Sequence, residues 1–353
     1  MAASLPTSLP DALDLPLSFS SEVTVQLSPD PAMASVSVGG YVASAMAKYA
    51  LYYASKHPKM QNQVDLYSTV TQFYRPIFIG MPIKMTLREV SIGKGWSTLR
   101  VEAFQTDKLA ASADLVVTNL SDGGITLKTG WHLPSNPVPV DLAKLGTDTD
   151  PNWVSYHCAF YPDGFRRGHS YAKSFIPRVQ PTEVSFVEQW VEPGWDSLPQ
   201  GSRPLTAGEN KARWTNEMIP FVVDMTLPIQ ENFFPHEEGK SPPVGSIAAT
   251  LGYAARQQQA REEGRDDWRV IGDDGSKRFG ARILHVSLSL STEIKQRLAP
   301  EGVRWLYLRS ECKRVLNGRM DLEVLVFDER MDLIAISHQT AVLIEGTSKM
   351  QKL

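Results

Sequence analysis

The chain carries a repeated series of short apolar segments. Residues 82–119 follow the order strand, glycine-containing turn, strand, acidic turn and strand, and residues 305–345 follow the same order. The first turn of the second copy is Asn317-Gly318, a dipeptide that favours a two-residue hairpin between alternating apolar runs. The pattern therefore predicts two copies of one three-stranded meander.

A strand and a helix precede each meander. Residues 64–75 and 281–291 alternate apolar and small polar positions, which is typical of a strand with one buried face. Helical spacing predicts a helix over residues 40–55 in the first copy and another over residues 217–229 in the second. Each copy is thus an α+β unit, predicted to wrap a curved antiparallel sheet around one apolar helix. Two such units in tandem make a pseudo-dimer within one chain.

Composition divides the chain into two units. We expect the first unit at residues 1–128 and the second at residues 151–353, with a linker at residues 129–150. The linker is rich in Pro, Gly, Asp and Thr, which favour turns. The second unit contains an insertion at residues 232–277, in which residues 247–262 are predicted to be helical. The insertion is either a lid or a surface decoration.

Charge and the lengths of the apolar runs argue against several protein classes. The formal net charge is -3 over 353 residues, and no basic cluster of the kind that binds nucleic acid is present. No apolar run is long enough to span a membrane, and the N-terminus does not resemble a signal peptide.

The remaining features favour a cytoplasmic location. Two cysteines, Cys158 and Cys312, form no disulfide framework, which favours a reducing compartment. The final residues Gln351-Lys352-Leu353 share only two positions with a peroxisomal address, so that compartment is the weaker alternative. His157 and Cys158 have no second pair at zinc spacing, and we expect neither a metal nor a cofactor.

Several segments resemble a known family. They are Val38-Gly39-Gly40-Tyr41-Val42, Phe73-Tyr74-Arg75-Pro76, Leu109-Ala110-Ala111-Ser112, Asn317-Gly318-Arg319-Met320-Asp321-Leu322 and Ala335-Ile336-Ser337-His338-Gln339. Together they resemble the double hot-dog acyl-CoA thioesterases of the acyl-CoA thioesterase II type, and the second half resembles fungal thioesterase-like proteins. The resemblance implies a tandem hot-dog fold and covers most of the chain apart from the linker and the insertion.

The resemblance also implies a catalytic set of an Asp, a Ser or Thr, and a Gln. The Asp maps onto Asp224 and the Gln onto Gln339. The hydroxyl position falls on Ile283, which departs from the family, and His285 or Ser287 is expected to supply the polar group instead. Strand alternation is predicted to place four residues on one face of their strand: Ile283, His285, Ser287 and Ser289.

Only the second copy carries this set. Leu115 is the counterpart of Gln339, and residues 44–47, which correspond to Asp224, contain no acid. We therefore expect the first copy to be non-catalytic and to form one wall of the acyl channel. Its helix start supplies the expected substrate-binding residues Gly39, Gly40 and Tyr41.

These residue types suit water-dependent hydrolysis of a thioester. A buried carboxylate such as Asp224 accepts a proton from water, and the neutral amide of Gln339 donates a hydrogen bond without adding charge. A helix N-terminus stabilises the developing oxyanion. No Gly-x-Ser-x-Gly elbow suggests a covalent route. The hot-dog hydratase pattern fails because Ile229 and Glu231 stand at its Asn and His positions.

The expected function is hydrolysis of an acyl-CoA, or of a carrier-bound acyl or polyketide thioester, by water that Asp224 activates. The alternative is a hot-dog protein that has lost hydrolysis and binds, releases or cyclises an acyl or polyketide intermediate. A purely structural subunit is a third possibility. The chain already contains a pair of units, so a monomer and a homodimer of double units both stay open.

Overall fold

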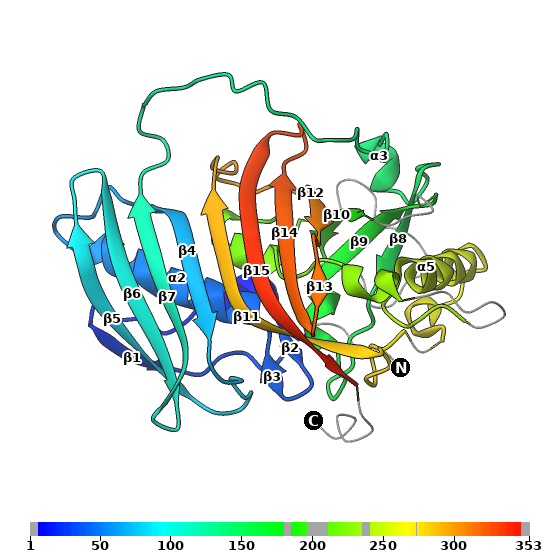
Figure 1. Ribbon diagram of the computed structural model, residues 1–353, viewed down its shortest axis with the longest axis horizontal. Helices are drawn as coiled ribbons and strands as arrows, with labels where there is room; N and C mark the ends of the chain where they lie inside the picture. The colour runs from blue at the N-terminus through cyan, green and yellow to red at the C-terminus, as the bar shows by residue number, and fades with distance from the viewer. Residues whose placement is uncertain (1–5, 180–184, 196–210, 235–240, 273, 347–353) are drawn as a thin grey trace.

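The computed structural model describes the chain except residues 1–5, 180–184, 196–210, 235–240, 273 and 347–353. One antiparallel sheet runs through the described residues in the order β1-β5-β6-β7-β4-β11-β15-β14-β12-β10-β9-β8 (Figure 1). The first-half strands are β1 (Glu22–Val25), β4 (Asp65–Phe73), β5 (Ile83–Ile92), β6 (Trp96–Gln105) and β7 (Lys108–Thr118). Their second-half counterparts are β10 (Phe186–Pro193), β11 (Ile283–Ile294), β12 (Leu306–Glu311), β14 (Arg319–Phe327) and β15 (Leu333–Glu345).

The strand order has an internal two-fold symmetry. Strands β4 and β11 pair antiparallel at its centre, where Val70 lies opposite Ser291. Leu290 comes one residue before Ser291, and Thr69 comes one residue before Val70. The two-fold symmetry therefore makes Leu290 and Thr69 equivalent positions. Leu290 pairs with Gln339 and Thr69 pairs with Leu115. The register therefore confirms that Leu115 is the counterpart of Gln339.

The remaining strands lie at the edges or in turns. Strands β8 (Trp153–His157) and β9 (Ala172–Pro177) extend the second-half edge of the sheet. Strand β13 (Val315–Leu316) pairs with β14, and the predicted Asn317-Gly318 turn joins them with both residues at positive φ. This backbone is the one that a type I′ turn requires. Strands β2 (Ala32–Met33) and β3 (Val36–Ser37) form a separate small hairpin.

The predicted first helix is confirmed as α2 (Gly39–Lys56), which contacts β4, β6 and β7 of the sheet. The second helix was predicted over residues 217–229, and that extent is wrong. The chain forms only a 3₁₀ turn η2 (Asn216–Met218), α4 (Ile219–Val222) and, further on, a 3₁₀ turn η3 (Ile229–Phe233). Two causes act together, because β-branched Val222 and Val223 weaken the helix and Pro228 disfavours helical geometry just before it.

The insertion contains α5 (Ile247–Glu262), which confirms the helix predicted there. Ser246 caps it, since its hydroxyl accepts a hydrogen bond from Ala249 N. The helix packs against β8 at the outer edge of the second half. Short elements complete the fold: α1 (Leu9–Leu13), α3 (Leu142–Leu145), η1 (Arg167–Tyr171) and η4 (Trp268–Val270).

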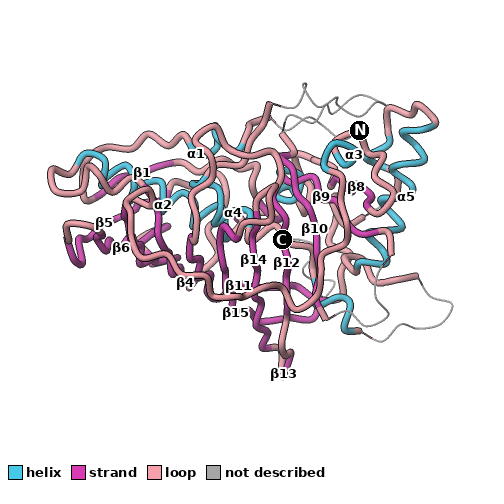
Figure 2. Tube along the Cα trace, turned by 90° about the horizontal axis from the view of Figure 1, so that it is seen from above, coloured by secondary structure: helices cyan, strands magenta, loops and turns pink. Residues whose placement is uncertain are grey.

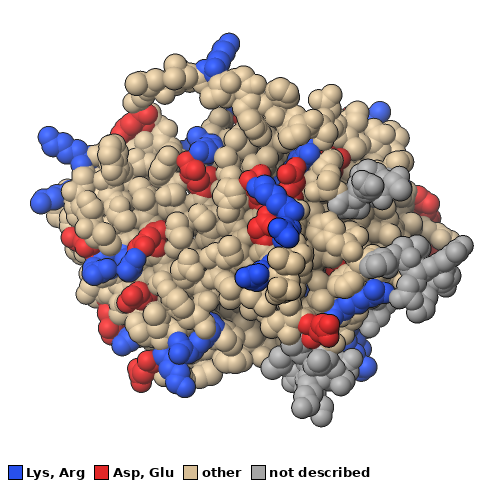
Figure 3. Space-filling model, in the orientation of Figure 1, with Lys and Arg blue, Asp and Glu red and all other residues tan. Residues whose placement is uncertain are grey.

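Helices α2 and α4 contact each other on one side of the sheet (Figure 2). After β7 the chain passes over the top of the molecule in Figure 1 before it reaches α3. Lys, Arg, Asp and Glu side chains are interspersed on the face shown in Figure 3. No helix among the described residues is long and apolar enough to cross a membrane. Cys158 and Cys312 are both free thiols. The architecture is the tandem pair of units that the repeat predicted, and it agrees with the hot-dog fold that the family resemblance implied.

Candidate functional site

A cavity of about 520 Å³ lies between the two halves, and we call it the central cavity. Most of its surface is apolar, as is typical of a small-molecule site. Its first-half wall comes from within residues 33–42 and 73–78. Its second-half wall comes from within residues 165–169, 224–231 and 275–288, together with Val244, Gly245, Leu322 and Gln339.

Asp224 lines this cavity directly after α4. Its Oδ2 accepts a hydrogen bond of 2.8 Å from the backbone N–H of Gly40, at the start of α2. A Cβ at Gly40 would lie 2.5 Å from Pro220 O, 2.7 Å from Asp224 Cβ and 2.9 Å from Phe221 Cα. Only glycine permits this approach, so the first half of the chain holds the acid of the second.

Burial raises the pKa of Asp224, and the Gly40 hydrogen bond offsets part of that rise. The helix N-terminus that supplies this N–H also favours negative charge. The raised pKa makes the carboxylate a better proton acceptor than a solvent-exposed Asp. The side chain remains partly exposed to the cavity.

Gln339 extends from β15 into the same cavity wall. Its Nε2 donates a hydrogen bond of 3.1 Å to the carbonyl of Val223, the residue before Asp224. Its Oε1 has no hydrogen-bond partner among the described residues. The amide of Gln339 and the carboxylate of Asp224 thus line one cavity, and the amide is held by the backbone next to Asp224.

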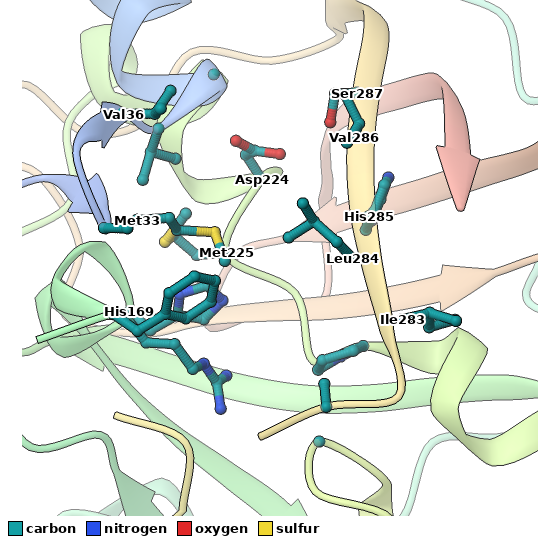
Figure 4. Close-up of a pocket in the computed structure, with 18 of the residues that line it drawn as sticks. Met33, Val36, His169, Asp224, Met225, Ile283, Leu284, His285, Val286 and Ser287 are labelled. Carbon is teal, nitrogen blue, oxygen red and sulfur yellow. The ribbon is translucent and has the colours of Figure 1, made fainter. Parts of the chain in front are cut away.

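Ser287 and His285 come from β11, and both line the cavity. Figure 4 shows the Ser287 hydroxyl on the side of β11 that faces Asp224. Burial lowers the pKa of His285 to about 4, so the ring is neutral near pH 7. Its Nε2 has no hydrogen-bond partner within the described part of the chain.

The predicted alternation along β11 fails after Ser287. The register of β11 against β15 shifts between Ser287 and Ser289, which marks a β-bulge. Ser289 consequently bonds Thr340 on an exposed face, with 2.6 Å between the two hydroxyl oxygens, and lies outside the cavity wall. The predicted shared face therefore does not extend to Ser289. Ile283 does line the cavity, as a hydrocarbon group.

The three residues predicted to bind substrate lie in different environments. Gly39 lines the cavity, and a Cβ there would lie 3.1 Å from Phe73 Cζ. Gly40 holds Asp224 as described above. Tyr41 is fully buried, and its hydroxyl donates to Ala12 O at 2.6 Å and accepts from Ser28 N at 3.0 Å. Tyr41 does not line the cavity, so its position supports a structural role and not the predicted binding role.

Other polar residues of the wall were not predicted from the sequence. Glu231 is 1% exposed, and burial raises its pKa to about 7. Arg166 and His169 also line the cavity. Glu231 lies between Gln230 and Asn232, so its immediate sequence is polar and does not indicate a buried position. Among the described residues, no three His, Cys, Asp or Glu side chains are grouped to hold a metal ion.

Two family models match the chain. The model of the acyl-CoA thioesterase N-terminal domain matches residues 28–119, and the model of the C-terminal domain matches residues 139–343. A curated relative, the thioesterase-like protein TwmA of Talaromyces wortmannii, is 24% identical over 327 residues. That match covers 87% of this chain and 83% of the relative.

Solved structures show the same fold. A putative thioesterase II from Thermobifida fusca YX matches with a TM-score of 0.62 and 15% identity, covering 97% of this chain and 100% of that one. Acyl-CoA thioesterase II TesB2 from Mycobacterium marinum matches with a TM-score of 0.54 and 14% identity, covering 96% and 99%. A hot-dog protein from Alicyclobacillus acidocaldarius has a TM-score of 0.60 at 12% identity and covers 97% and 100%.

Proposed function

Because the chain belongs to the acyl-CoA thioesterase family, we propose that it hydrolyses an acyl thioester with water that Asp224 activates. The substrate is an acyl-CoA or a carrier-bound acyl or polyketide chain. The observation that carries the proposal is the pairing of Asp224 and Gln339 in the wall of one apolar cavity. The equivalent position of the first half holds Leu115, so that half lacks the amide.

In the first step, Asp224 accepts a proton from water as the water oxygen attacks the thioester carbonyl carbon. Gln339 and Ser287 orient the water with neutral hydrogen bonds. Gly39 is the first residue of α2, where a backbone N–H has no partner within the helix, and it lines the cavity. We assign to this N–H the stabilisation of the oxyanion of the tetrahedral intermediate.

In the second step, the intermediate collapses and the carbon–sulfur bond breaks. The leaving thiolate takes the proton that Asp224 received, which gives a free thiol and a free acid. The apolar wall excludes bulk water, and its low dielectric strengthens the hydrogen bonds to the oxyanion. The route needs no covalent enzyme intermediate.

The proposal is tested with a panel of acyl-CoA and acyl-pantetheine thioesters, by measuring thiol release and identifying the free acid. The informative variant is Gln339→Leu, which installs the side chain of the equivalent position 115. We expect it to fold and to lower kcat/KM by about 10²-fold, as loss of one donor at a reacting centre does. Full activity in Gln339→Leu removes the amide from the mechanism.

The second candidate function is binding or release of an acyl intermediate without hydrolysis. Ile283 favours it, because a hydrocarbon group lines the wall where the family resemblance implied a hydroxyl. The same panel separates the two functions. A ligand that binds the central cavity tightly, with no thiol released from any thioester, supports this candidate and contradicts hydrolysis.

A further inference from the structure

The insertion, residues 232–277, supplies part of the wall of the central cavity. Three of its described residues, Val244, Gly245 and Gly275, line the cavity, and Phe279 and Gly280 of the following segment continue the wall. Asp224, Ser287 and Gln339 belong to other elements. The insertion therefore shapes the space available to a ligand without carrying the proposed chemistry.

The insertion meets the cavity at the end remote from the Asp224–Gly40 contact. A Cβ at Gly245 would lie 3.3 Å from Glu231 Cγ and 3.6 Å from Pro228 Cγ. Pro228 ends the stretch without regular secondary structure that follows Asp224, and Glu231 lies beyond it in η3.

Figure 4 shows the same separation. Asp224 and Ser287 lie at one end of the view, whereas His169 and Ile283 lie at the other. Gly275 of the insertion belongs to the second end, because a Cβ there would lie 3.8 Å from Cδ of Arg166, a near neighbour of His169 in the chain.

Val244 is held between two stretches of backbone at this remote end. A Cβ at Gly275 would lie 3.1 Å from Val244 Cγ1, and a Cβ at Gly280 would lie 3.6 Å from both of its γ carbons. Gly275 has φ +84°, a conformation that other residues rarely adopt. The two glycines leave room for the valine side chain and fix its position, so its methyl groups form a defined boundary.

The surface that a chain end meets here is hydrocarbon. Val244, Phe279 and Ile283 line it, and Phe279 packs edge-on against Phe165 at 5.1 Å between ring centroids. Glu231 also lies in this wall, but both of its carboxylate oxygens are shielded from the cavity. The guanidinium of Arg166, at the same end of the cavity, donates a hydrogen bond to Asp274 O at 3.4 Å. At the surface formed by Val244, Phe279 and Ile283 an alkyl terminus fits, whereas a charged terminus would lose its hydration.

We propose that Val244 determines acyl-chain length, by packing against the apolar terminus of a thioester whose carbonyl lies at Asp224. This inference rests on the proposed function, since it places the reacting carbonyl at Asp224. The substrate class is an acyl thioester with an unsubstituted alkyl end. One methylene more or less at such a boundary changes kcat/KM by about tenfold or more.

The test compares Val244→Ala, Val244→Phe and the wild type on straight-chain acyl-CoAs from butanoyl to hexadecanoyl. Val244→Ala is expected to raise kcat/KM about tenfold for the first chain that the wild type rejects as too long. Val244→Phe is expected to move the optimum to shorter chains, with the shortest thioester unaffected in both variants. Val270→Ala is the matched control, because Val270 lies in the same insertion outside the cavity wall.

A second arm separates this inference from the proposed function. Binding of S-alkyl-CoA thioethers, which cannot be hydrolysed, is measured by calorimetry over the same chain lengths. If no thioester is turned over, the proposed hydrolysis fails, and the shift in thioether affinity still tests the boundary. Identical chain-length profiles for wild type, Val244→Ala and Val244→Phe, all folded, overturn the inference. An equal shift in Val270→Ala overturns it as well.

Discussion

Replacement of Gly40 with alanine tests how the two halves are joined at the site. The added Cβ would lie 2.5 Å from Pro220 O, 2.7 Å from Asp224 Cβ and 2.9 Å from Phe221 Cα. Two of these contacts involve backbone atoms, so α2 and α4 must separate to relieve them. Overpacking of this kind costs about 1–3 kcal/mol of folding free energy.

The separation also weakens the hydrogen bond from Gly40 N to Asp224 Oδ2. A hydrogen bond to a charged group contributes about 1.5–3 kcal/mol, so loss of this bond together with the overpacking costs about 2.5–6 kcal/mol of folding free energy. A displaced carboxylate should lower kcat/KM by about 10²-fold, since misplacement by about 1 Å has that effect. Urea denaturation followed by circular dichroism measures the first quantity, and thiol release measures the second.

Gly39→Ala is the matched control for this experiment. Its Cβ would lie 3.1 Å from Phe73 Cζ, the end of a side chain that can move, and 3.5 Å from Asp224 Oδ2. We expect a stability change within about 1 kcal/mol, because the loss of backbone freedom in the unfolded chain offsets the crowding. If Gly40→Ala is as stable as Gly39→Ala, the close approach of α2 to Asp224 is refuted.

Two further predictions concern the cavity wall. The folded-state pKa of Glu231 is raised from 4.5 to about 7, so the wild type loses stability as the pH rises from about 4.5 to about 7. Glu231→Gln avoids that loss and should be more stable than the wild type above pH 7 by up to about 3 kcal/mol. Thermal denaturation should show this stability difference closing near pH 4.5. A stability difference that does not change with pH refutes the raised pKa of Glu231. Ser287→Ala should lower kcat about tenfold at unchanged stability, as loss of one neutral hydrogen bond does, whereas Ser289→Ala on the exposed face should change neither in the same assays. Equal activity of the two serine variants would remove Ser287 from the site.

The repeat was predictable because strand alternation and turn chemistry are local. Asn317-Gly318 forms the predicted turn, and Leu115 is the symmetry equivalent of Gln339 in the other half of the sheet. That equivalence required only correct alignment of two meanders in the sequence. The tandem fold and the asymmetry of the polar residues in its last strands followed from it.

Features that depend on contacts between distant segments were not predictable. The second helix stops at Val222, and the predicted continuation through Asp224 instead forms a turn against α2. The β-bulge after Ser287 contains no glycine or proline that would have indicated it in the sequence. Tyr41 has the sequence context of a binding residue, yet its hydroxyl satisfies backbone groups that come from α1 and the loop after β1.

The insertion illustrates the same difficulty. Its helix α5 was predictable from the sequence because helical spacing is a local signal. Its contribution to the cavity, through Val244 and Gly245, depends on contacts with residues 228–231 and 275–280. Such contacts produce no periodic pattern in the sequence, so the sequence alone could not distinguish a lid from a surface decoration as the role of the insertion.

The most direct test of the central claim is thioester hydrolysis by Asp224→Asn, which preserves the size of the side chain and removes its ability to accept a proton. Circular dichroism and the urea midpoint establish that the variant is folded. The account predicts that kcat/KM for the best acyl thioester falls by about 10²–10⁴-fold, the contribution of a general base. Hydrolysis at the wild-type rate by folded Asp224→Asn would contradict it.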